Sequence, residues 1–311
     1  MKRSTAGSAV LAAVAVGATL MLVFTAEKDA MVSTASVVSP PSASATTTAP
    51  VTTTPALTTE TTPTSTTLSV EQSQALAENA LRALRGTVSG AALGMEVYDR
   101  QTGTVLTSLN ADEQFASMSV VKLLIAIDIL ARNDFALPSQ STQDRITRML
   151  STSDDSIASS FWVSEGGTSI ITRDVALMGL TGTRPPTSAG QWGSTKITAH
   201  DMVTVYDYVL DKLPDDAEKL LYDAMYHATS AGADGTYQYF GIPDGLPGAT
   251  WAIKQGWGSS GSHAYYNTTG VVGADSRYVV VLLSDGPLSA YRTLPKALTA
   301  ATAALSSLVS D

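Results

Sequence analysis

The sequence predicts an α+β domain in which a five-stranded antiparallel sheet is flanked by N- and C-terminal helices, with an all-helical segment inserted in between. Three observations predict this fold. Strand patterns come in two separate groups, near residues 91–109 and 251–285. Amphipathic helical patterns fill the region between the two groups, and one further helical pattern stands outside each group. Both ends of the domain are therefore expected to meet in one sheet.

The elements follow one another in a simple order along the chain. The segment VEQSQALAENALRALRG has a helical pattern that ends at Gly86. The turn RQTG joins two alternating segments, which predicts a β-hairpin. Prolines and glycines interrupt the helical patterns at residues 181–196, so this stretch is expected to be a loop. Strands are expected at 91–99, at 104–109 and within TWAIKQGW, AYYNTTGVV and RYVVVLLSD; helices are expected from about Ser119 to Arg132, at 142–150, 153–164 and 168–179, within HDMVTVYDYVLDKL and DAEKLLYDAMYHAT, and from about Leu288 to Val309.

The first 30 residues are typical of an export segment. Lys2 and Arg3 precede an apolar run from about Ala9 to Ala26, which is long enough for either a signal peptide or an uncleaved membrane anchor. The positive charges are expected to stay inside, so the rest of the chain is expected to be exported to the cell envelope or the extracellular space.

Residues 31–67 are dominated by Thr, Ser and Pro. Such a composition cannot bury apolar surface, so the segment is expected to be a disordered linker. The folded domain is then expected to comprise residues 68–311. Its α/β part would consist of residues 68–116 and 250–311, and its helical part of residues 117–249.

The composition excludes several kinds of function. A net charge of −9 argues against nucleic acid as a partner, because phosphate binding needs clustered Lys and Arg. The chain has no cysteine, which excludes disulfides, thiolate metal sites and a lipidated cysteine anchor. With three histidines and no paired-histidine spacing, no metal or other cofactor is expected. A monomer is expected, which acts on a small molecule or peptide and meets the membrane through its N-terminal segment only.

A lysine interrupts one of the most apolar stretches of the chain, SMSVVKLLIAIDIL at residues 117–130. Lys122 lies three residues after Ser119, so in a helix the two side chains share one face. A buried lysine loses its charge readily and can then accept the proton of a serine hydroxyl. Matches to S-x-x-K also arise by chance in a chain this rich in serine, so the pair alone does not establish a catalytic site.

Two further segments follow in a fixed order: SDD at residues 153–155, where a helix is expected, and KQGWG at residues 254–258, on an expected strand. The order S-x-x-K, S-D-N, K-T-G is the signature of the penicillin-recognising serine acyltransferases, which include class A β-lactamases and penicillin-binding proteins. With SVVK, SDD and KQGWG in that order, residues 69–311 resemble this superfamily. The resemblance implies the β-lactamase/transpeptidase-like fold.

The resemblance also implies catalytic roles for four residues. Ser119 would be the acylated nucleophile and Lys122 its proton acceptor. Ser153 would pass the proton towards the leaving group, and Lys254 would supply positive charge that supports Ser153 and attracts a substrate carboxylate. Taken alone, Ser153 would instead be interpreted as a helix N-cap, for which serine is a favoured residue.

Five residues are expected to bind the substrate, and two of them depart from the superfamily's pattern. Asp155 stands where Asn is usual; a carboxylate cannot donate a hydrogen bond to a substrate carbonyl, but it could hold Lys122 protonated or bind an amine-bearing ligand. Gln255 replaces Thr. Gly256, Trp257 and Gly258 would let the strand approach the substrate, and backbone N–H groups at Ser119 and near Trp257 or Gly258 would form an oxyanion hole.

A further departure lies in the loop before Asp201. Class A β-lactamases carry a glutamate there that activates the deacylating water, whereas residues 180–196 of this chain contain none. Glu165 lies too early, and Gln191 could position a water but cannot serve as a base.

These observations predict an exported serine hydrolase that forms an acyl-enzyme at Ser119. Its substrate would be a β-lactam or a cell-wall peptide-like amide, and efficient β-lactam turnover is not expected without the loop glutamate. A second interpretation stays open: a catalytically impaired binding module of the cell envelope with the same cleft. The complete set of Ser119, Lys122, Ser153 and Lys254 favours the enzyme, because a site without chemistry has no need of a buried lysine.

Overall fold

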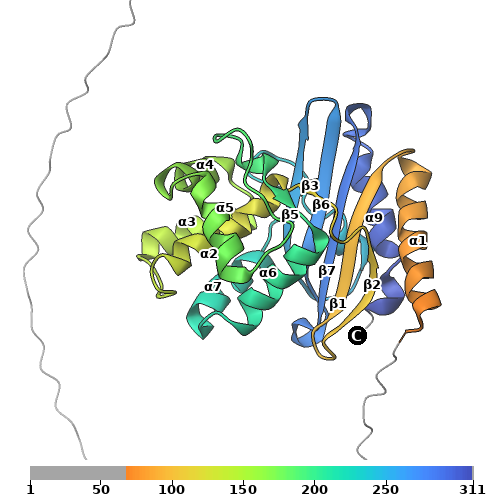
Figure 1. Ribbon diagram of the computed structural model, residues 1–311, viewed down its shortest axis with the longest axis horizontal. Helices are drawn as coiled ribbons and strands as arrows, with labels where there is room; N and C mark the ends of the chain where they lie inside the picture. The colour runs from red at the N-terminus through yellow and green to blue at the C-terminus, as the bar shows by residue number, and fades with distance from the viewer. Residues whose placement is uncertain (1–67, 310–311) are drawn as a thin grey trace, which may run out of the picture. The chain divides into compact units, whose positions relative to one another are not determined.

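The computed structural model describes residues 68–309 (Figure 1). The expected export segment and linker, residues 1–67, lie outside the described residues. The strands are β1 Ala92–Asp99, β2 Thr104–Leu109, β3 Phe115–Ala116, β4 Lys196–Ile197, β5 Trp251–Ser260, β6 His263–Val272 and β7 Tyr278–Pro287. The α-helices are α1 Val70–Thr87, α2 Val121–Ala131, α3 Gln140–Ser151, α4 Asp155–Ser164, α5 Thr168–Met178, α6 Ala199–Asp211, α7 Asp215–Tyr226, α8 Ile242–Gly245 and α9 Leu294–Ala303.

A five-stranded antiparallel sheet organises the part of the chain that the structure describes. Its strand order is β2-β1-β7-β6-β5, so the hairpin β1–β2 joins strands that come some 150 residues later, as the sequence predicts. A small second sheet pairs β3 with β4 and ties the segment before α2 to the end of the loop before α6.

The sheet separates two hydrophobic cores, and its central strand shows why. Along β7, Val279, Val281 and Leu283 face one core, whereas Val280 and Leu282 face the other. Side chains alternate between the two faces of a strand, so a run of consecutive apolar residues marks a strand that is covered on both sides. Figure 1 shows α1 and α9 along one face of the sheet and the helical segment on the other.

Helix α1 illustrates how local sequence sets an element. Ser69 accepts a hydrogen bond from the backbone N–H of Gln72, while the Gln72 side chain accepts one from the backbone N–H of Ser69. This reciprocal capping box satisfies donors that a helix start leaves unpaired. Apolar residues of α1 then pack onto α9 and the outer sheet face.

Helix α2 lies at the centre of the helical segment. All of its residues from Val121 to Leu130 are buried, among them Lys122 and Asp128. Asp128 is neutralised by Arg173 from α5, whose guanidinium donates two hydrogen bonds at 2.6 and 2.7 Å. Lys122 is a buried cation and needs acceptors instead; the groups around it form part of the site described below.

The expected α+β fold is confirmed, with three local differences. The final helix is shorter than expected, because 3₁₀ turns at Leu288–Ala290 and Ser306–Leu308 flank α9. The short β3–β4 pair and the one-turn helix α8 have too few residues to produce a periodic signal. Among the helices within residues 68–309, none combines the length and hydropathy needed to cross a membrane.

Candidate active site

Ser119 lies in a 3₁₀ turn, Met118–Val120, directly before α2. The turn begins with φ of 47° at Met118, a left-handed conformation that is uncommon for a residue with a side chain. Such a backbone costs about 1–3 kcal/mol and persists where the surroundings enforce it. The turn brings the Ser119 side chain to the wall of a cleft.

Two neighbouring strands hold the segment before Ser119 in place. At Gly256 of β5, an added Cβ would come within 2.5 Å of the carbonyl oxygen of Ser117, so only glycine allows this approach. Asn267 of β6 is fully buried and donates its amide to the Ser117 carbonyl oxygen at 3.1 Å. The expected close approach of Gly256 is therefore made to the nucleophile segment itself. Asn267 was not singled out from the sequence, because a lone Asn on a strand carries no pattern.

Lys122 is fully buried, and four oxygen atoms surround its amino group. Lys122 Nζ lies 2.8 Å from Ser119 Oγ, 3.1 Å from Ser153 Oγ and 2.7 Å from the Ser153 carbonyl oxygen. The fourth oxygen is Asp155 Oδ1, at 2.5 Å. Burial of Lys122 is thus compensated by hydrogen bonds to Ser119 and to the segment 153–155.

The charge state of Lys122 depends on two opposing effects. Burial lowers the pKa of the Lys122 ammonium, while the carboxylate of Asp155 raises it and offsets part of the effect of burial. Of the two roles left open for Asp155, the geometry matches the first, an ion pair with Lys122. The side chain of Asp155 is 67% exposed, so water screens this ion pair.

Ser153 precedes α4 and has φ of 56°, the second left-handed non-glycine residue of the site. Asp154, not Ser153, is the N-cap of α4: its carboxylate accepts hydrogen bonds from the N–H groups of Ser156 and Ile157. The N-cap interpretation of Ser153 is therefore wrong, and its hydroxyl is free to face Lys122. Asp fills the cap role as well as Ser does, so sequence alone could not decide between them.

Lys254 approaches Ser153 from the sheet side. Its amino group donates to Ser153 Oγ at 3.0 Å and to the Gln255 carbonyl oxygen at 3.0 Å. Burial lowers the pKa of Lys254 well below its usual range, and the nearby charge of Lys122 lowers it further. Lys254 is 1% exposed, so its amino group is not on the surface of the cleft.

Gln255 is placed differently from the expectation. Its side chain donates to the carbonyl oxygens of Gln238 at 3.0 Å and Phe240 at 2.6 Å, and the residue is 1% exposed. Gln255 therefore links β5 to the segment 238–240 and does not line the cleft. A side chain with polar ends looks the same in sequence whether it binds a ligand or backbone carbonyls.

The cleft next to Ser119 has a volume of about 400 Å³. Asp155, Trp257 and Gly258, three of the residues expected to bind the substrate, line it. Trp257 donates its indole N–H to Asp234 at 2.9 Å, which brings a second carboxylate to the cleft. The complete lining is Met118, Ser119, Asp155, Gly190, Gln191, Trp192, Gly193, Asp234, Trp257, Gly258, Ser259 and Tyr291.

The loop between α5 and α6 forms one wall of the cleft. Its start is fixed by the buried carboxylate of Asp201, which accepts hydrogen bonds from the backbone N–H groups of residues 181–183. Its end is fixed by the Thr195 carbonyl oxygen, which accepts from the N–H of Ser117. Between these points the loop carries Trp192, whose ring centroid lies 5.0 Å from Lys122 Nζ. An aromatic residue in a Gly-rich loop was the signal that could have indicated this contact.

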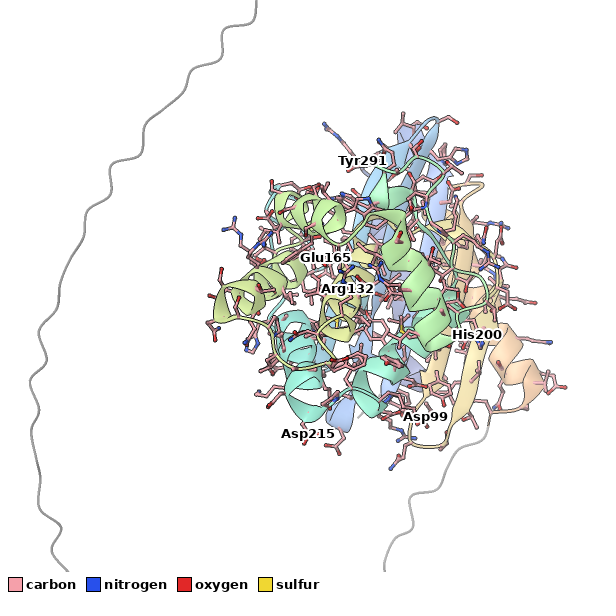
Figure 2. The ribbon with its side chains drawn as sticks, turned by 60° about the vertical axis from the view of Figure 1, so that its left-hand side comes forward. Asp99, Arg132, Glu165, His200, Asp215 and Tyr291 are labelled. Atoms are coloured by element: carbon pink, nitrogen blue, oxygen red, sulfur yellow. The ribbon has the colours of Figure 1, made fainter. Side chains whose placement is uncertain are left out.

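Glu165 does not take the place of a loop carboxylate. It caps the C-terminus of α4 and pairs with Arg132 at 3.5 Å, beside which Figure 2 shows it. No group of three or more His, Asp or Glu that could hold a metal ion is found within residues 68–309. The cleft is therefore lined by one candidate nucleophile, Ser119, and two carboxylates, Asp155 and Asp234, while Lys122 and Lys254 lie buried behind it.

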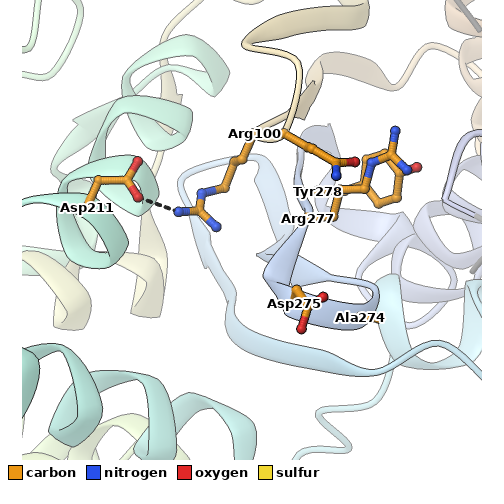
Figure 3. Close-up of a pocket in the computed structure, with 7 residues that line it drawn as sticks. Arg100, Asp211, Ala274, Asp275, Arg277 and Tyr278 are labelled. Atoms are coloured by element: carbon orange, nitrogen blue, oxygen red, sulfur yellow. Dashed lines mark hydrogen bonds and ion pairs between the residues drawn. The ribbon is translucent and has the colours of Figure 1, made fainter. Parts of the chain in front are cut away.

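A second cavity of about 400 Å³ lies at the other end of strands β6 and β7 (Figure 3). Its arginines are already paired: Arg100 donates to Asp211 at 2.6 Å, and Arg277 donates to Asp99 at 2.7 Å. Among the residues that line it, none is Ser, Thr or Cys.

Comparison with known proteins finds relatives of moderate sequence identity. No family model matches the chain. Over 207 residues, the chain is 38% identical to proteins described as a candidate lipoprotein, LppW, in Mycobacterium bovis and Mycobacterium tuberculosis. The match covers 64% of this chain, and the chain spans about 64% of the length of these relatives.

Solved structures show the fold more fully. A β-lactamase from Chitinophaga pinensis superposes with a TM-score of 0.62 at 12% identity, covering 76% of this chain and 100% of its own. A β-lactamase from Burkholderia vietnamiensis gives 0.62 at 20% identity, covering 75% and 96%, and PBP-A gives 0.58 at 16% identity, covering 74% and 95%. The described part of the chain therefore has the fold shared by class A β-lactamases and PBP-A, as its motifs predict.

Proposed function

We propose that this protein is a serine acyl-enzyme hydrolase that acts on a β-lactam or a cell-wall peptide-like amide. One observation supports this most strongly: Lys122 Nζ lies 2.8 Å from Ser119 Oγ, while Ser153 Oγ lies within 3.1 Å of both lysine amino groups. The proposed nucleophile, base and proton relay are thus in hydrogen-bond contact, which is the arrangement that activation of a serine requires.

The proposed chemical step is the acylation of Ser119. Neutral Lys122 accepts the hydroxyl proton of Ser119, and Ser119 Oγ forms a bond to the carbonyl carbon of the substrate. The bond from that carbon to the leaving nitrogen breaks, and the nitrogen takes a proton relayed from Lys122 through Ser153. Lys254 stabilises the Ser153 oxygen during the relay by its hydrogen bond.

Release of the acyl group is proposed to be slow. Hydrolysis of an acyl-enzyme needs a base that activates water, and a general base typically contributes about 10²–10⁴-fold. The loop wall presents Trp192 and Gln191 instead of a carboxylate, and the Trp192 ring covers Lys122. The fold is shared with a PBP-A variant that is described as an acyl-enzyme complex with penicillin G.

The second candidate, a binding module without turnover, is favoured by the Lys122–Asp155 ion pair. An ammonium held by a carboxylate cannot accept a proton from Ser119. Burial opposes this effect by lowering the pKa of Lys122, so the balance between the two decides between the candidates. The relatives described as a candidate lipoprotein support a place in the cell envelope for either one.

The experiment that separates the candidates uses the purified full-length chain. Benzylpenicillin and a neutral phenylacetyl thioester are added separately, and intact-protein mass spectrometry follows the mass of the protein over time. A Ser119→Ala variant is the matched control. We expect an adduct on the wild type that outlasts the excess probe, and none on the variant.

The other outcomes are equally informative. Probe consumed by the wild type without a lasting adduct would show that water is activated by some other group, and slow release would be wrong. Absence of both adduct and turnover with both probes would refute the enzyme and leave the binding module.

A further inference from the structure

The cleft beside Ser119 is lined by two carboxylates, Asp155 and Asp234, and by no Lys, Arg or His. Lys254, the residue expected to attract a substrate carboxylate, is 1% exposed and donates its hydrogen bonds to Ser153 and to a backbone carbonyl. The cleft therefore presents negative charge to an incoming molecule. Like charges repel, so a carboxylate on the substrate would be disfavoured here.

Asp234 is held in an orientation that keeps it ionised. Burial raises its pKa, but hydrogen bonds from the backbone N–H and hydroxyl of Thr236 and from the Trp257 indole outweigh burial, so the net pKa is lowered. Its charge reaches the reaction centre, since it raises the pKa of Lys122. Unlike Asp155, Asp234 has no lysine or arginine partner among the ion pairs of residues 68–309.

Aromatic side chains line the cleft that holds this carboxylate. Trp257 touches Asp234 directly, and Trp192 and Tyr291 line the same cleft. Aromatic faces attract cations, most strongly ammonium groups without competing water. Figure 2 shows Tyr291 near the edge of the molecule.

We propose that the cleft selects substrates that carry a positively charged amine, which pairs with Asp234 beside the ring of Trp257. This inference rests on the proposed function, because it assigns the substrate class of the same nucleophile. The acyl compounds it favours are amides or esters with an ammonium group near the bond that is broken. Compounds whose recognition depends on a free carboxylate are the disfavoured class.

The first measurement is of binding alone, and it does not depend on catalysis. Three phenylacetyl amides are titrated calorimetrically into the Ser119→Ala variant: one ends in a trimethylammonium group, one in the isosteric tert-butyl group and one in a carboxylate. We expect the ammonium compound to bind about tenfold more tightly than the tert-butyl compound, from charge attraction and the aromatic ring together. The carboxylate compound should bind most weakly.

The second measurement is of acylation. The corresponding thioesters of the same three groups react with the wild-type chain; the Ser119 Oγ–acyl bond forms, the C–S bond breaks and the thiol leaves with the serine proton. The rates should follow the same order. In an Asp234→Asn variant, which keeps an acceptor for Trp257 but removes the charge, the tenfold preference should fall to about one. In Asp216→Asn, an exposed residue of α7 outside the cleft, the preference should persist.

The two measurements separate failure of this inference from failure of the proposed function. Equal acylation by all three thioesters, or a preference for the carboxylate, would overturn the inference and leave the acyl-enzyme intact. Selective binding of the ammonium compound without any acyl-enzyme would instead refute the proposed function and support selection of cations by the cleft. A preference that survives in Asp234→Asn would overturn the assignment of Asp234.

Discussion

Replacing Asp155 by Asn should increase the rate at which Ser119 is acylated. The perturbation removes the charge that holds Lys122 as an ammonium and keeps the size of the side chain. Two unit charges 2.5 Å apart attract by about 1.7 kcal/mol in bulk water and about 6.6 kcal/mol at an effective dielectric constant of about 20. Because the Asp155 side chain is 67% exposed, screening places the ion pair near the lower figure, at about 1.5 kcal/mol. The neutral fraction of Lys122, and with it the acylation rate near neutral pH, should rise about tenfold.

The assay is stopped-flow acylation by the neutral phenylacetyl thioester between pH 5 and pH 10. The rate should increase with pH as Lys122 loses its proton, and the rising part of the profile should move to lower pH in Asp155→Asn. The direction follows from the carboxylate raising the pKa of Lys122 in the wild type. Asp216→Asn controls for the loss of one surface charge.

Two results would refute this reasoning. A slower Asp155→Asn variant would show that the carboxylate itself is needed, for instance to carry the proton. A faster variant with an unmoved pH profile would show that the new amide acts by contacting the substrate, and that Lys122 is not the group whose ionisation limits the reaction.

Three further predictions concern the support of the site and its loop. Gly256→Ala should lower the free energy of unfolding by about 2 kcal/mol in urea denaturation, because its Cβ would meet a backbone carbonyl oxygen, whereas Gly86→Ala in α1, with open space, should raise it slightly; equal effects would contradict the close-approach argument. Trp192→Glu should shorten the lifetime of the Ser119 adduct at least about tenfold by supplying a base for water, and an unchanged lifetime would show that base and water are misplaced. Asp174 is buried, and its Oδ2 atom has no hydrogen-bond partner among the described residues. Burial raises the pKa of its carboxyl well above the usual range. The unfolded chain therefore releases this proton at lower pH than the folded one, and stability falls as pH rises from about 4 through the folded pKa. Asp174→Asn should remove that fall and gain about 1–3 kcal/mol at pH 7 relative to pH 4, and parallel pH curves for the two proteins would contradict it.

Much of the fold could be predicted because its long elements are either amphipathic, as α1 is, or continuously apolar. Strand β7 is a run of consecutive apolar residues, and α2 is a helix buried on all sides. The boundaries were less accurate where geometry departs from regular structure. The expected helix from Ser119 begins as a 3₁₀ turn, because the left-handed backbone of Met118 cannot belong to an α-helix.

The candidate site was predictable only where spacing carries information. Ser119 and Lys122 are three residues apart, so helical geometry alone brings them together. Trp192 and Asp234 reach the cleft from loops that no period describes, and their contacts depend on how distant segments pack. Gln255 shows the converse case: it stands in a motif, yet its side chain turns to backbone carbonyls.

Because both ends of the loop before α6 are fixed, the stretch between them can vary in length and sequence. Asp201 accepts hydrogen bonds at the start of the loop, and Arg184 and Lys196 form backbone hydrogen bonds with each other across it. At its end, Thr195 bonds to the segment before Ser119. Length and sequence inside a loop closed in this way can change at little cost, since closure entropy grows only slowly with loop length. The wall that faces Lys122 can thus change, and with it the fate of the proposed acyl group, without refolding Ser119, Lys122 and Ser153.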